Sequence, residues 1–204
     1  MIKKFFTQYV EENKYDIYII SMLLIIGFFV GVGLFFLINA EVSNQLINAA
    51  KSVFDASMQA DNLKINVILN GVKVNLILII AFLLFSITLI GRVFIYFSTI
   101  LKGISIGIYS CIIFSIFNIW WGLVVTCLLV VLINLVYIPA YIYLASTLLA
   151  FNFGLFNTKK ENTSWFSVTK VLTKTIAVFV FMFSSSIVEH MLTGVVFTIY
   201  EKIV

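Results

Sequence analysis

Residues 91–107 read GRVFIYFSTILKGISIG, an apolar run that carries two cations, Arg92 and Lys102. These are the only charged residues between Val74 and Thr158. A charge in the middle of a membrane helix costs about 2.5–3.5 kcal/mol on insertion scales, so each cation needs a physical reason. Either the two cations contact cargo, or they mark a place where the chain turns at a membrane surface.

The composition is that of a membrane protein. Of the 204 residues, 62% are hydrophobic and 11% are charged, with a mean hydropathy of +1.14, whereas about a quarter of the residues of a soluble domain are charged. Because one crossing takes about 20 apolar residues, the sequence predicts a single all-α domain, 1–204, a polytopic integral membrane helical bundle with about five transmembrane helices. This length leaves no room for a separate soluble catalytic domain.

Hydropathy and charge divide the chain into nine segments. Trp120 and Trp121 indicate a hairpin at a membrane surface between the third and fourth spans, and Pro139 is expected to bend the long fourth span. In chain order the segments are an N-terminal stretch (1–16), span one (17–40), an outer amphipathic segment (41–66), span two (74–92), an elbow (93–102), span three (103–118), span four (122–151), a loop (152–174) and span five (175–199).

The distribution of cations predicts the topology. With a cytoplasmic N-terminus, nine of the 13 cations fall on the cytoplasmic side, as the positive-inside rule requires. Arg92 and Lys102 then bound a cytoplasmic elbow, with their side chains reaching the headgroups. An interfacial elbow is the favoured interpretation, while a re-entrant segment and a cargo-binding role for the two cations stay open.

Two pairs of small residues predict close helix packing. Gly27 and Gly31 in span one, and Gly103 and Gly107 in span three, have the GxxxG spacing that lets helix backbones approach. The alternative is that glycine is simply frequent in membrane helices.

The outer segment alternates apolar and polar residues at helical spacing. It is expected to rest on lipid headgroups or fold over the bundle. A third possibility is that it receives a partner, with Val53 and Phe54 as the candidate surface.

Nothing in the sequence indicates catalysis. Glu189 is the only acid within a predicted span and lies next to the only histidine, His190. There is no second cluster of acids or histidines for a proton relay, a metal centre or an intramembrane protease, and no phosphate-binding loop. We expect no enzyme, no cofactor, no metal and no nucleic-acid partner, with Glu189 as a hydrogen-bonded packing group.

Four motifs follow one another in a specific order: GFFVGVG (27–33), LKGISIG (101–107), IPAYIYLA (138–145) and SSSIVEHML (184–192). In this order the chain resembles the stage II sporulation protein M family of membrane proteins. The resemblance implies a noncatalytic scaffold in the cell membrane at the sporulation septum. It would anchor two peptidoglycan hydrolases, a lytic transglycosylase and an amidase, during forespore engulfment.

A second hypothesis comes from a different class of protein. The chain would be a permease-like subunit of an ABC-type or other transporter, with Lys102, Asn134 and Glu189 lining a path. Membrane lipids are partners under both hypotheses. A homo-oligomer stays open.

Overall fold

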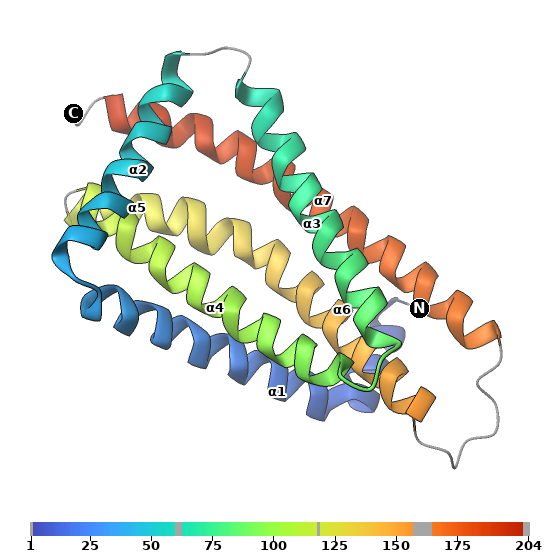
Figure 1. The fold of residues 1–204 in the computed structure, drawn as a ribbon. Coiled ribbons are helices and arrows are strands. Elements are labelled where there is room, and N and C mark those ends of the chain that lie inside the picture. Colours follow the sequence, from blue (N-terminus) through green and yellow to red (C-terminus); the bar gives the residue numbers. More distant parts are fainter. Residues whose placement is uncertain (1, 60–62, 118, 157–164, 202–204) are drawn as a thin grey trace.

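The computed structural model describes residues 2–59, 63–117, 119–156 and 165–201 (Figure 1). These residues form seven α-helices and one π-helical turn, and they contain no strand. In order they are α1 (Ile2–Leu37), α2 (Ala40–Gln59), α3 (Leu63–Ser86), α4 (Gly91–Ile116), α5 (Ile119–Thr126), η1 (Cys127–Leu132), α6 (Ile133–Phe156) and α7 (Trp165–Glu201).

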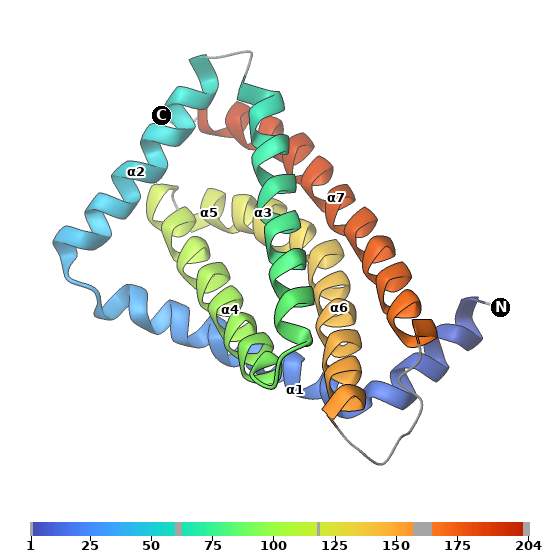
Figure 2. The ribbon, with the colours of Figure 1, turned by 45° about the vertical axis from the view of Figure 1, so that its right-hand side comes forward.

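The predicted class, an all-α membrane bundle, is confirmed. Four helical segments of the described chain are long and apolar enough to cross a bilayer: Asn13–Leu37, Gly91–Ile116, Trp120–Asn152 and Val171–Glu189. A fifth apolar segment, Val72–Ser86 of α3, is shorter. The two ends of the chain lie at opposite ends of the bundle (Figures 1 and 2).

The prediction of an elbow at 93–102 is wrong. This segment is helical and continuous with the predicted span three, so that both belong to the single helix α4. The chain turns earlier, at residues 87–90, between the end of α3 and Gly91. Arg92 therefore stands in the first turn of α4, whereas Lys102 lies about 15 Å further along the helix, at 1.5 Å per residue.

Other helices extend beyond the boundaries that hydropathy predicted. Segment 1–16 is largely helical, because α1 begins at Ile2 and has a kink at Asn13 (φ −115°, ψ 17°). Helix α3 begins at Leu63 instead of Val74, and α7 begins at Trp165, inside the predicted loop. Backbone hydrogen bonding continues into polar sequence outside a bilayer, so apolar length underestimates helix length.

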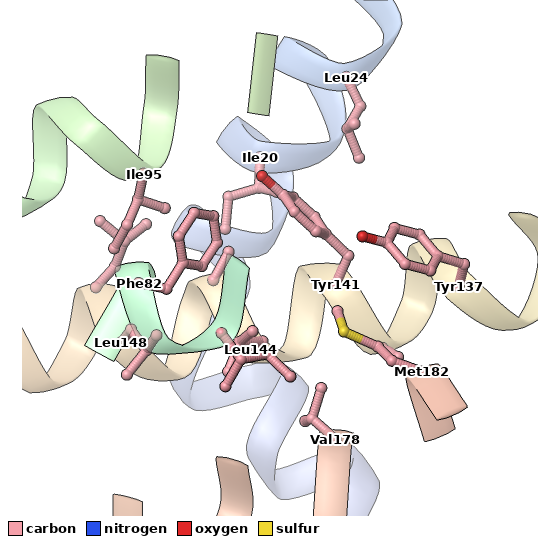
Figure 3. Close-up of a cluster of buried hydrophobic side chains, with 14 residues drawn as sticks. Ile20, Leu24, Phe82, Ile95, Tyr137, Tyr141, Leu144, Leu148, Val178 and Met182 are labelled. Atoms are coloured by element: carbon pink, nitrogen blue, oxygen red, sulfur yellow. The ribbon is translucent and has the colours of Figure 1, made fainter. Parts of the chain in front are cut away.

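The long helices pack around α6. Helix α1 makes its most extensive contacts with α4, and α7 packs against both α6 and α3. Figure 3 shows side chains from these helices meeting in one apolar cluster. The largest fully buried member is Tyr141, whose hydroxyl lies 3.1 Å from Thr99 Oγ1 on α4. Members on five helices include Ile20 (α1), Phe82 (α3), Ile95 (α4), Leu144 and Leu148 (α6), and Met182 (α7).

Helix α2 lies across one end of the bundle, beyond the ends of α1 and α4 (Figure 2). Its main contacts are with α4. Most side chains of its first part, 40–52, are exposed. The first part of the predicted outer segment is thus an exposed stretch of helix at the edge of the bundle.

Candidate functional site

A polar cavity of about 510 Å³ lies among α3, α4, η1, α6 and α7. Its apolar walls are formed by Val74, Ile106, Leu129 and Ile133. We call it the polar cavity, and its polar lining consists of Asn75 (α3), Lys102, Ser105 and Tyr109 (α4), Asn134 and Tyr137 (α6), and Ser185 and Glu189 (α7).

Helix α4 supplies the cation of the polar cavity from one of its faces. Lys102, Ser105 and Tyr109 are spaced three and then four residues apart, which aligns them along the helix. Gly103 and Gly107 are buried on a different face of α4, against α1. Close packing on α1 therefore fixes which face of α4 points into the cavity.

Lys102 has an aromatic ring and a carboxylate near it on other helices. Its Nζ lies 4.3 Å from the centre of the Tyr137 ring on α6, in cation–π geometry. The carboxylate of Glu189, on α7, attracts it electrostatically. Lys102 thus occupies the middle of a membrane helix through contacts across the bundle. The three residues of the transporter hypothesis, Lys102, Asn134 and Glu189, line this one cavity.

Two asparagines of the cavity wall donate hydrogen bonds, one within its own helical run and one to another helix. Asn134 follows the π-helical turn η1, and its Nδ2 donates a hydrogen bond to Val130 O at 2.7 Å. Asn75 Nδ2 donates to Ser186 Oγ at 3.3 Å and so links α3 to α7. A π turn widens the helix and changes the direction of the side chains that follow, and such turns are frequent at functional sites.

The structure brings the two glycine pairs together at the interface of α1 with α4. A methyl group added to Gly27 would lie 2.5 Å from Ile100 O, and one added to Gly103 would lie 2.5 Å from Leu24 O. Gly31 and Gly107 are packed even more tightly against the opposite backbone. Only a hydrogen in place of Cβ permits this approach.

Pro139 lies within α6, which continues through it. The irregular part of the predicted fourth span is the π-helical turn η1, which precedes the proline. Figure 2 shows α5 and η1 inclined to α6. Pro139 also lines a separate apolar cavity of about 450 Å³ between α6 and α7, together with Leu135 and Phe181.

Asn152 was missed from the sequence, although it organises the turn between α3 and α4. It is 2% exposed, and its Nδ2 donates to both Ser86 O and Thr88 O at 2.7 Å. Its Oδ1 accepts a hydrogen bond from Arg92 Nε at 3.2 Å. The sequence does contain a signal for this role: Asn152 is an amide in an otherwise apolar stretch, and a buried amide requires hydrogen-bond partners.

Arg92 consequently has a structural role at this turn. Gly91 belongs to the same arrangement, since a Cβ there would lie 3.0 Å from Asn152 Nδ2 and would collide with Phe85 O. The cation at the start of α4 and the cation in its middle have different surroundings, and only Lys102 lines the polar cavity.

Val53 and Phe54 lie in α2, but their side chains fall outside the described residues, as does that of His190. The chain matches no protein-family model, no curated protein and no solved structure. Among the described residues, no three histidine, cysteine, aspartate or glutamate side chains gather at one place. Function is therefore inferred from the cavity, the packing and the sequence motifs.

Proposed function

We propose that this chain is a noncatalytic membrane scaffold that anchors a septal peptidoglycan-degrading complex during forespore engulfment. The observation that carries the proposal is the position of α2, an exposed amphipathic helix at one end of a closely packed bundle. The order of the four sequence motifs and their likeness to the stage II sporulation protein M family support it. The partners would be a lytic transglycosylase and an amidase, which cut the wall while this chain holds them in place.

In this proposal the bundle holds the chain in the membrane, and α2 contacts the partners. The glycine-packed pair of α1 and α4 and the shared apolar core give a rigid body in the membrane. If the N-terminus is cytoplasmic, α2 lies on the outer side, next to the wall. An amphipathic helix can then present its apolar residues to a partner, as helix-in-groove complexes do.

The test is to place an acidic side chain on the apolar face of α2. Val53→Asp and Phe54→Asp are expected to release both hydrolases from the septum while the protein stays in the membrane fraction. Asn48→Asp is the matched control, because it adds the same charge at an exposed polar position of the same helix. Co-purification of the hydrolases with the Val53 and Phe54 variants at the level of the unchanged protein would argue against this surface.

A second candidate function is that of a permease-like transporter subunit, and the polar cavity favours it. Polar and charged side chains within membrane helices are expensive and commonly mark substrate or ion paths. Here Lys102, Asn134 and Glu189 come from three helices to one cavity. Glu189→Gln separates the candidates, since a scaffold should keep engulfment intact, whereas a transporter that uses this carboxylate should stop.

A further inference from the structure

The polar cavity contains one side chain of each charge sign among its described lining residues, Lys102 and Glu189. They lie on two different helices, α4 and α7, which both border the cavity. A ligand with a single charge would match only one of these groups. A ligand with both charge signs would match both and would leave the site electrically neutral.

The hydroxyl groups of the cavity define where hydrogen-bond donors of a ligand would go. Ser105 Oγ donates its proton to Leu101 O at 2.9 Å, and Ser185 Oγ donates to Met182 O at 2.7 Å. Each oxygen therefore offers only lone pairs to the cavity. Together with the Glu189 carboxylate, these acceptors suit a group that has several N–H bonds.

The cation of the cavity is positioned for an anionic group. The ring of Tyr137 holds the Lys102 ammonium from one side, and an ammonium has three donors, which leaves N–H bonds for a ligand. The apolar part of the cavity lining is aliphatic: Val74, Ile106, Leu129 and Ile133. These would contact an apolar body between or beside the charged groups of a ligand.

We infer that the polar cavity binds a small zwitterion with a primary ammonium group, a carboxylate or phosphate group, and a short apolar portion. Its volume of about 510 Å³ falls in the range of about 300–1,000 Å³ typical of small-molecule sites. Two sources offer this chemistry: free amino acids, and the headgroup of phosphatidylethanolamine. The inference is independent of the scaffold role, and it specifies a substrate class for the transporter candidate.

The test uses the full chain in nanodiscs made of phosphatidylcholine, whose quaternary ammonium has no N–H donor. One arm measures binding of radiolabelled leucine. The other arm adds phosphatidylethanolamine to the discs and measures by native mass spectrometry which lipid the protein retains. Leucine binding indicates a soluble ligand, and preferential retention of phosphatidylethanolamine indicates a lipid headgroup; either result supports the inference.

The side chains that carry the binding are tested in the same discs. Lys102→Met and Glu189→Gln should each weaken binding by about 30-fold or more, the usual effect of removing one member of a buried charged contact. Lys73→Met and Glu41→Gln make the same changes at exposed positions and should leave binding unchanged. Should a charge variant fail to yield folded protein, Ser105→Ala with Ser185→Ala removes two acceptors without changing charge and should weaken binding about fivefold or more.

The inference is overturned if the unchanged protein binds no leucine and shows no preference for phosphatidylethanolamine over phosphatidylcholine. It is equally overturned if binding persists in the folded variants of Lys102, Glu189 or the two serines. The transporter candidate fails separately: binding without uptake into liposomes leaves the zwitterion site intact and excludes transport by this chain alone. Uptake of a solute without binding of either zwitterion would exclude the site and retain the transporter.

Discussion

Gly103→Ala tests whether backbone contact between α1 and α4 stabilises the bundle. The new Cβ would lie 2.5 Å from Leu24 O and 2.9 Å from Gly27 Cα, both of them backbone atoms. Ordinary contact begins near 3.4 Å, so the two helices must separate by about 0.9 Å at this point. Overpacking of this kind costs about 1–3 kcal/mol, because interhelical contacts on both sides of the site are lost.

The matched control is Gly33→Ala on α1, where an added methyl group meets no atom within 4 Å. Alanine forms helix better than glycine by about 1 kcal/mol, and this gain applies to both variants, so their difference isolates the packing cost. We expect the free energy of unfolding of Gly103→Ala to be about 1–3 kcal/mol lower than that of Gly33→Ala. Both are measured by denaturant unfolding in detergent, followed by far-UV circular dichroism. Equal unfolding of the two variants would refute close packing at this interface.

Two further substitutions test buried hydrogen bonds with the same unfolding measurement. Asn152→Leu removes the donor shared by Ser86 O and Thr88 O. The Thr88 carbonyl keeps its bond from Gly91 N, whereas the Ser86 carbonyl stays buried without this donor, so a loss of about 1–3 kcal/mol is expected. An unfolding curve like that of the unchanged protein would contradict this role. Tyr141→Phe keeps the ring in the core and loses only the contact with Thr99. The free energy of unfolding should fall by about 1 kcal/mol. A fall of more than about 3 kcal/mol would contradict a single hydrogen bond as the role of this hydroxyl.

The polar cavity and the outer helix give two different reasons for polar groups in this chain. Those in the first part of α2, residues 40–52, are mostly exposed at one end of the bundle, where water or a partner can reach them. Those of the cavity come from α3, α4, α6 and α7 and line one space inside the bundle. The proposed anchoring surface and the proposed ligand site are therefore separate parts of the molecule, and substitutions in one are expected to leave the other intact.

Local sequence was sufficient for features that depend on composition and spacing. Apolar length determined that the chain is a helical membrane protein. The four-residue spacing of Gly27 with Gly31, and of Gly103 with Gly107, identified the small-residue faces, because residues four apart share one side of a helix. Neither pattern contains the identity of a partner helix, which depends on how the whole chain folds.

Only the tertiary structure decided what Arg92 and Lys102 do. In sequence, each is a lone cation in an apolar run, and an uncompensated charge at membrane depth is unfavourable, so the sequence alone predicts that both lie at a turn. Arg92 does lie beside the turn, held by Asn152 from 60 residues away. Lys102 lies in the middle of α4, with its Nζ 4.3 Å from the Tyr137 ring centre and in the same cavity as Glu189. Such neighbours come from distant parts of the sequence, and hydropathy, which measures one stretch at a time, cannot detect them.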